Sequence, residues 1–120
     1  MNGYSYVDVG DLAGEGPGGV VRKTRRAVGA RAFGFNYFVL PPNRQGREHS
    51  HGDSNQEEVY FVVKGSGTMR VAGEELELKP GRFVRVDPAV TRLPIAGPDG
   101  LEFIAFGAPL DAPYEPPDWG

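Results

Sequence analysis

The sequence predicts an all-β protein, folded as a sandwich or barrel, and three observations lead to this prediction. Short apolar or alternating segments recur at regular spacing, glycine and proline residues separate them, and no segment has convincing helical periodicity. The chain has 18 glycines and 11 prolines among its 120 residues, which favours frequent turns over long helices. A chain of this length is expected to form one domain.

The first half of the chain contains the expected strands in a clear order. A weak alternation over residues 4–9 predicts a short first strand, and the glycine-rich residues 11–19 are expected to form a loop. Residues 32–40 are apolar on both faces, which is typical of a strand buried between two sheets. Residues 58–64 and 68–72 are expected to run in opposite directions, because residues 65–67 (Gly-Ser-Gly) turn the chain between them.

The second half predicts four further strands, at residues 75–79, 83–86, 91–95 and 101–106. In the first of these, leucines alternate with charged residues, so one of its faces is expected to meet solvent. Pro80-Gly81 and Asp87-Pro88 separate the segments, and Gly97-Pro98-Asp99-Gly100 predicts a hairpin turn between the last two. The regular spacing of short strands indicates a sandwich or barrel.

Composition and charge exclude several classes of protein. The chain has no cysteine, which excludes disulfides, thiolate metal sites and thiol nucleophiles. The net charge of −3 does not favour nucleic acid as a partner, and no apolar run approaches the roughly 18 residues that span a membrane. The first residues lack the pattern of a signal peptide, so we expect a cytoplasmic protein.

A basic run lies near the N-terminus and has two interpretations. It consists of Arg22, Lys23, Arg25 and Arg26. Such a cluster can form an anion-binding arm, but the acidic character of the whole chain favours a solvated face.

The residues with the clearest chemistry are His49, His51 and Glu58. Side chains alternate along an extended strand, so two histidines one residue apart point the same way. Two imidazoles and one carboxylate are a ligand set for a divalent transition metal, and the set resembles the facial triad of non-haem iron sites. The alternatives are a pair of buried core histidines and a carboxylate held in an ion pair.

The order of these residues, together with the glycines and prolines around them, resembles the small single-domain cupins. The first motif of that family is matched by Gly46, His49, His51, Glu58 and Gly65, and the second by Gly73, Pro80, Gly81 and Pro88. The resemblance covers residues 33–106 and implies a double-stranded β-helix, the jelly-roll barrel of this superfamily. We accordingly divide the chain into an N-terminal arm (1–31), a barrel core (32–107) and a proline-rich tail (108–120).

The sequence departs from the cupin pattern at two places. Six residues separate His51 from Glu58, more than is usual in the family, so Glu57 or Gln56 is an alternative ligand. The third histidine of the family is absent, and Arg92 stands in its place. Arginine has no lone pair to give to a metal. Arg92 is expected to point away, to pair with a neighbouring glutamate, to contact an anionic ligand beside the metal, or to be an exposed strand residue.

We therefore expect the site to bind a divalent metal (Fe, Mn, Ni or Zn) and a small, anionic organic molecule. The metal ligands are expected to be His49, His51 and Glu58, and the ligand-binding residues Arg92, Tyr60, Glu57, Gln56 and Asn36. Oxygen insertion and isomerisation are both open for a metal site. Without a metal, the site is a small-molecule binding module or sensor, or an epimerase-like enzyme with a histidine base.

The resemblance also implies a homodimer, formed through a sheet edge or face. An unpaired edge strand needs a cover, and the N-terminal arm and the proline-rich tail are candidates for it. Trp119 is expected to anchor the tail against the barrel or a partner subunit.

Overall fold

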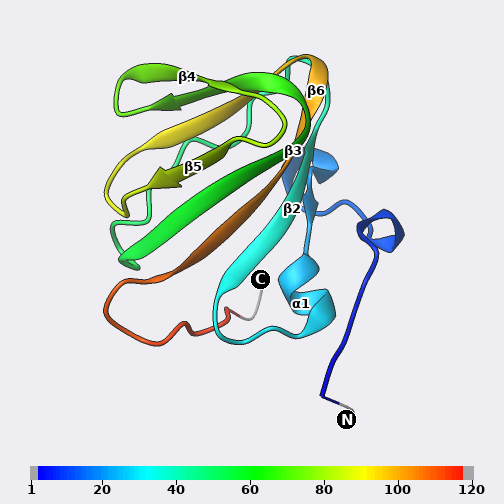
Figure 1. Ribbon diagram of the computed structural model, residues 1–120, viewed down its shortest axis with the longest axis vertical. Helices are drawn as coiled ribbons and strands as arrows, with labels where there is room; N and C mark the ends of the chain where they lie inside the picture. Colours follow the sequence, from blue (N-terminus) through cyan, green and yellow to red (C-terminus); the bar gives the residue numbers. More distant parts are fainter. Residues whose placement is uncertain (1–2, 118–120) are drawn as a thin grey trace.

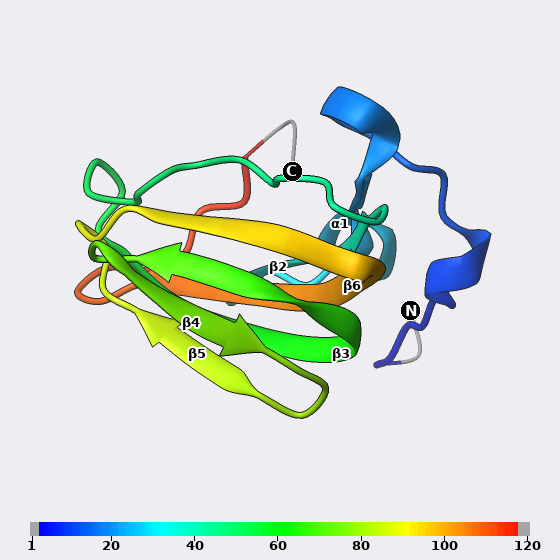
Figure 2. The ribbon, with the colours of Figure 1, turned by 90° about the horizontal axis from the view of Figure 1, so that it is seen from above.

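The computed structural model describes residues 3–117 and shows a rolled antiparallel sheet with little helix (Figures 1 and 2). Its strands are β1 (Val21–Arg22), β2 (Gly34–Leu40), β3 (Gln56–Val71), β4 (Glu74–Leu78), β5 (Phe83–Val86) and β6 (Arg92–Pro109). The helical elements are η1 (Val9–Asp11), η2 (Pro17–Gly19) and α1 (Thr24–Val28). The predicted all-β fold is confirmed. Trp119 lies outside the described residues.

Two long strands, β3 and β6, form the centre of the sheet. The strand order is β1-β2-β6-β3-β4, and β5 pairs with the first part of β3. β3 and β6 are antiparallel from the pair Gln56↔Pro109 to the pair Val71↔Arg92. Both strands bend in the middle, so that the first half of β6 (yellow) lies above its second half (orange) in Figure 2. The bend folds this pair of strands over and encloses the core.

The two turns predicted at residues 65–67 and 97–100 are bends inside these continuous strands, not hairpin loops. The halves on either side of each bend pair with the other long strand instead of with each other. The strands approach so closely at the bend that a Cβ atom at Gly65 would lie 2.2 Å from the carbonyl oxygen of Gly100. A Cβ atom at Gly67 would lie 2.3 Å from the Ile95 carbonyl oxygen. Glycine is required here because the backbones touch.

The N-terminal arm differs from its prediction. The strand expected at residues 4–9 is wrong, because residues 4–8 have no regular structure and η1 begins at Val9. Helix α1 was not expected, since five residues are too few to show helical periodicity, and it ends where Gly29 takes a φ of 78°. Along the arm and the rest of the described chain, no helix has the length and apolar character needed to cross a membrane.

Side-chain alternation along the strands separates a filled part of the core from an open one. Leu101 and Phe103 of β6 are almost fully buried and fill the part near the bend. Farther along β6, the inward positions are Ala105 and Gly107, which are small. Ala105 pairs with Asn36 on β2 and with Tyr60 on β3, and Gly107 pairs with Glu58 on β3. The small residues leave room in front of polar ones, and this end of the barrel is where a site can form.

Gly65→Ala is expected to destabilise the fold more than Gly81→Ala does. Both glycines have a φ of +90°, so both alanines carry a similar backbone strain of about 1 kcal/mol. A Cβ atom at Gly81 meets nothing within 4 Å, whereas at Gly65 it meets the opposite backbone. The collision is expected to cost Gly65→Ala roughly another 1–3 kcal/mol of unfolding free energy. Urea unfolding of both variants measures the difference, and equal losses would contradict a close approach at the bend.

Candidate metal centre

The two histidines lie on an extended segment that runs beside the beginning of β6. The amide of His49 donates to the Arg92 carbonyl at 3.0 Å, and the Arg92 amide donates back to the His49 carbonyl at 2.9 Å. The His51 amide donates to the carbonyl of Pro88 at 2.7 Å. Since these backbone bonds hold the segment extended at both residues, the two imidazoles project toward the same side.

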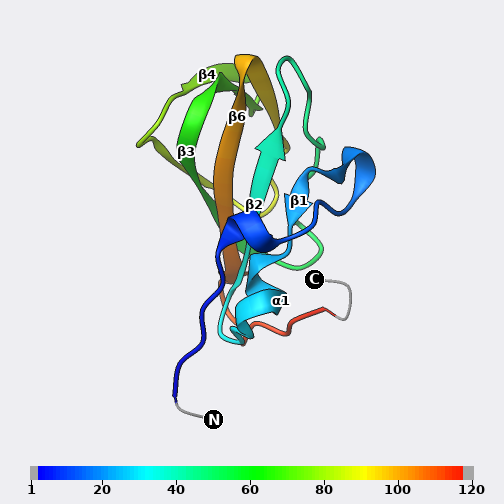
Figure 3. The same ribbon diagram turned by 90° about the vertical axis from the view of Figure 1, so that its right-hand side faces the viewer.

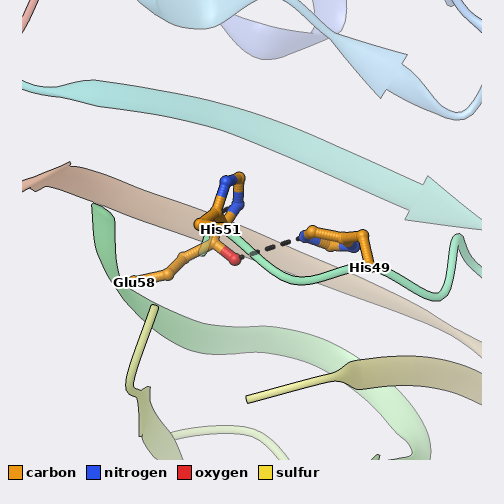
Figure 4. A group of neighbouring side chains, drawn as sticks. All are labelled: His49, His51 and Glu58. Carbon is orange, nitrogen blue, oxygen red and sulfur yellow. Dashed lines mark ion pairs between the residues drawn. The ribbon is translucent and has the colours of Figure 1, made fainter. Parts of the chain in front are cut away.

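His49, His51 and Glu58 converge at the open end of the barrel (Figure 4). The Nε2 atom of His49 lies 3.6 Å from Oε1 of Glu58, and Nε2 of His51 lies 3.3 Å from Oε2. One ligand atom from each residue can be chosen so that all lie within 4.8 Å of one another. The two imidazoles face each other nearly edge to face, with ring centroids 5.0 Å apart.

The hydrogen bonding of these side chains fits a divalent metal. Nδ1 of His49 lies 2.9 Å from the Arg47 carbonyl oxygen, which can only accept, so Nδ1 carries a proton; the neutral ring then has its lone pair on Nε2, the atom that would bind a metal. Metal-binding histidines are commonly oriented by such a bond. Among the described residues, His51 Nε2 and Glu58 Oε1 are buried without a hydrogen-bond partner. A metal would give these lone pairs a partner.

Glu58 is held in its charged form. Burial raises the pKa of its carboxyl group, but the neighbouring side chains of His49, His51 and Tyr60 more than offset this, and the pKa falls from 4.5 to about 2. The side chain is only 13% exposed. Glu58 therefore presents a full negative charge to the site at neutral pH.

Arg92 lies against Glu58 and is completely buried, with an exposed fraction of 0%. Its Nε atom is 3.6 Å from Glu58 Oε1, and its Nη1 donates to the Val90 carbonyl at 2.7 Å. Its Nε and Nη2 atoms have no hydrogen-bond partner within residues 3–117. Of the arrangements considered for Arg92, the structure shows the ion pair with Glu58, and the exposed strand arginine is wrong.

A cavity of about 360 Å³ opens beside His51 and Glu58. Asn36 and Gln56, both expected to bind ligand, are among its lining residues, whereas Tyr60 and Arg92 are not. The hydroxyl of Tyr60 instead lies 3.5 Å from Nε2 of His49, beneath the cluster. The apolar part of the lining is formed by Phe35, Phe38 and Ala105.

Glu57 is separated from the cavity by the alternation of β3. Its neighbour Glu58 points inward, so Glu57 points outward, where its carboxylate accepts a hydrogen bond from Arg85 at 3.0 Å. The strand geometry thus favours Glu58 over Glu57 as the carboxylate of the cluster.

The cavity also contains residues that sequence reasoning missed, because they come from the arm and the tail. Arg25 of α1 is only 8% exposed and lines the cavity, as do Tyr114, Glu115 and Pro117 of the tail. The solvated face favoured for the basic run is wrong for Arg25, because helix α1 turns this side chain into the barrel's cavity instead of toward solvent. The tail packs against β2 at Gly34, where a Cβ atom would lie only 2.8 Å from the Tyr114 hydroxyl. The sequence has a glycine at this position, but nothing local in the sequence identifies Tyr114 as its neighbour.

The tail is tied to the loop that follows His51. The amide of Leu110 donates to the Asn55 carbonyl at 3.1 Å, and the Asn55 side chain donates to Asp111 at 3.0 Å. The loop and the tail therefore meet at the same edge of the cavity.

The fold and the site together define a class: small antiparallel barrels that carry two histidines and a carboxylate at one end. The family model for the cupin domain matches residues 36–100, more than half of the chain. This chain belongs to the cupin domain family. The resemblance described above is thereby confirmed.

Solved structures support the same fold. A cupin protein from Bacteroides fragilis has a TM-score of 0.77 and 22% identity, over 93% of this chain and 89% of that one. A protein described as a predicted oxalate decarboxylase, from Thermotoga maritima, has a TM-score of 0.72 and 20% identity, over 88% and 99%. A DMSP lyase from Ruegeria pomeroyi has a TM-score of 0.59 and 16% identity, over 69% and 42%. No curated protein matches the sequence.

The metal-free protein is expected to lose stability in acid through Glu58. Because folding lowers the pKa of Glu58 from 4.5 to about 2, its contribution is complete above pH 4.5 and is lost as the pH falls toward 2. The contribution is on the order of 3 kcal/mol. Glu58→Gln should therefore be less stable than wild type at neutral pH, and the gap should narrow over this range.

Urea unfolding at a series of pH values, with chelator present, measures this effect. Glu57→Gln is the matched control, since it removes an adjacent carboxylate that faces outward. A gap between wild type and Glu58→Gln that is constant from pH 6 to pH 2 would contradict the stabilised carboxylate.

Proposed function

We propose that this cupin binds a divalent transition metal through His49, His51 and Glu58 and binds a small organic anion in the adjoining cavity. The observation that carries the proposal is the convergence of three ligand atoms within 4.8 Å of one another. Two of the three residues, His51 and Glu58, also line the cavity. A molecule in the cavity would therefore lie beside the metal.

The donor set narrows the choice of metal. Two imidazole nitrogens and one carboxylate oxygen suit iron, manganese, nickel or zinc. Three protein ligands leave coordination positions open, and a bound metal would act as a Lewis acid toward an oxygen atom of the ligand. His49 is oriented for this role by its bond to Arg47, and Glu58 by its contact with Arg92.

The cavity supports a small ligand with a charged end and an apolar body. A volume of about 360 Å³ is near the lower end of the range for small-molecule sites, about 300–1,000 Å³. A bound metal would add positive charge at the His51–Glu58 end of the cavity and would favour an anionic group there, whereas Phe35 and Phe38 favour apolar groups. Asn36 and Gln56 offer amide groups that can fix the orientation of the ligand.

The structural neighbours do not identify the reaction, if any, that this chain carries out. Their names refer to different activities, a decarboxylase and a lyase, and at 20% and 16% identity they support the fold alone. The proposal therefore covers the metal and the class of ligand, for an enzyme or a binding protein.

One observation favours a second candidate, a metal-free site. The guanidinium of Arg92 lies 3.6 Å from Glu58 and already gives this carboxylate a cationic partner. In that case His49 or His51 would serve as the base of an isomerase-like enzyme, or the cavity would serve a binding module or sensor. The metal content of the protein distinguishes the two candidates.

Protein purified without a histidine tag or chelator is expected to contain about one metal ion per chain, measured by elemental mass spectrometry. His51→Ala and Glu58→Gln should lose the metal, because each removes a ligand atom, whereas Glu57→Gln should retain it. An absence of metal in the wild type, even after incubation with iron, manganese, nickel and zinc salts, would reject the proposal. Thermal-shift screens with small carboxylates would then test the metal-free candidate.

Arg92→His is expected to tighten metal binding, because it removes a buried cation and offers a third imidazole as a fourth ligand. Arg92→Met is the matched variant that removes the charge without adding a ligand. Two like charges about 4 Å apart repel by several kcal/mol in a partly buried site, so Arg92→Met should raise the affinity about tenfold or more. Arg92→His should raise it further.

Competition against a chelator measures these affinities, and circular dichroism shows whether each variant is folded. Equal affinity in wild type, Arg92→Met and Arg92→His would show that Arg92 does not influence the metal.

A further inference from the structure

The described part of the tail, residues 110–117, lies at the open end of the barrel. It leaves β6, turns back and runs toward α1, as Figures 1 and 3 both show. The chain bends at residues 110–112, and the described residues after the bend have no regular structure. Three of them form part of the cavity wall: Tyr114, Glu115 and Pro117. A segment that lies outside the sheet thus borders the cavity.

Two contacts within the described residues hold the tail in this position. At the bend, the Leu110 amide donates to the Asn55 carbonyl at 3.1 Å, and the Asn55 side chain donates to Asp111 at 3.0 Å. Farther along, the Tyr114 hydroxyl lies only 2.8 Å from the place that a Cβ atom at Gly34 would take. Because Gly34 has no side chain, β2 leaves a notch that receives the Tyr114 ring.

The tail is stiff beyond the bend, but it is not part of the sheet. Proline fixes φ, and proline-rich segments behave as semi-rigid spacers. Pro113 follows the bend directly, and Pro116 and Pro117 follow Tyr114. None of the residues 111–117 belongs to a strand, so the tail can turn away without breaking the sheet. A stiff segment with a bend at one end moves as a unit, and the bend is its hinge.

We propose that the tail is a hinged strap, which narrows the mouth of the cavity and swings away about residues 110–112 to admit an organic ligand. Asn55, which ties the strap at its hinge, belongs to the loop between His51 and Glu58. The strap is therefore anchored beside two of the candidate metal ligands. The inference rests on the proposed function only in taking the cavity as the place of the ligand, and its test needs neither metal nor ligand.

Because the chain has no cysteine, a single introduced thiol reports access to the cavity. Asn36→Cys places this thiol in the cavity lining, where the smaller side chain fits. With a chelator present, N-ethylmaleimide is expected to label it about tenfold or more slowly than Tyr6→Cys, because minor open conformations are populated at roughly 0.1–10%. Tyr6 is 83% exposed on the N-terminal arm and reports the unhindered rate.

Two further substitutions, each added to Asn36→Cys, loosen the strap at its two contacts. Asp111→Ala removes the hydrogen bond to Asn55 from a side chain outside the cavity lining, and should speed labelling roughly three- to tenfold. Gly34→Ala places a methyl group against Tyr114. In a rigid wall this methyl group would narrow the cavity and slow labelling, whereas with a strap it displaces Tyr114 and speeds labelling.

Asp99→Ala is the matched control for Asp111→Ala, since it removes an exposed carboxylate at the bend of the long strands and should leave the labelling rate unchanged. Thermal melts verify that each variant is folded. Labelling of Asn36→Cys that neither Asp111→Ala nor Gly34→Ala accelerates would overturn the strap, even where metal analysis supports the proposed function. Faster labelling in both variants of a protein that binds no metal would support the strap and reject the metal.

Discussion

The continuous pairing of β3 with β6 is the constraint on which the rest of the structure depends. The two strands remain hydrogen-bonded from Gln56↔Pro109 to Val71↔Arg92, and they bend together at Gly65 and Gly67. Glu58 lies near one end of this ladder and Arg92 at the other. Because the ladder folds over at its middle, residues 34 positions apart in the sequence come within ion-pair distance. The site is therefore a consequence of the bend.

The electrostatic balance of the site follows from the same geometry. Arg92 and His49 both contact Oε1 of Glu58, and His51 contacts Oε2. A metal ion and the guanidinium would thus both interact with the single carboxylate of Glu58. A bound metal would therefore have to compete with the guanidinium for this carboxylate.

Much of this arrangement could be predicted from local patterns. The alternation in residues 32–40, the pair His49 and His51, and the glycine positions indicated the fold and the cluster. The sequence did not show that Gly65-Ser66-Gly67 bends a strand without ending it, because hairpin and bend require the same glycines and only long-range pairing separates them. Likewise, Arg25 and Tyr114 reach the cavity through contacts between distant segments, which no local pattern records.

The contribution of the tail to the cavity separates the shape of the cavity from the stability of the sheet. Tyr114 and Pro117 form part of the wall, yet they follow the last strand and take no part in the sheet. Mutations in the tail can therefore change the shape of the cavity while the strands keep the fold. Such an arrangement gives evolution a way to alter the shape of the cavity at little risk to folding.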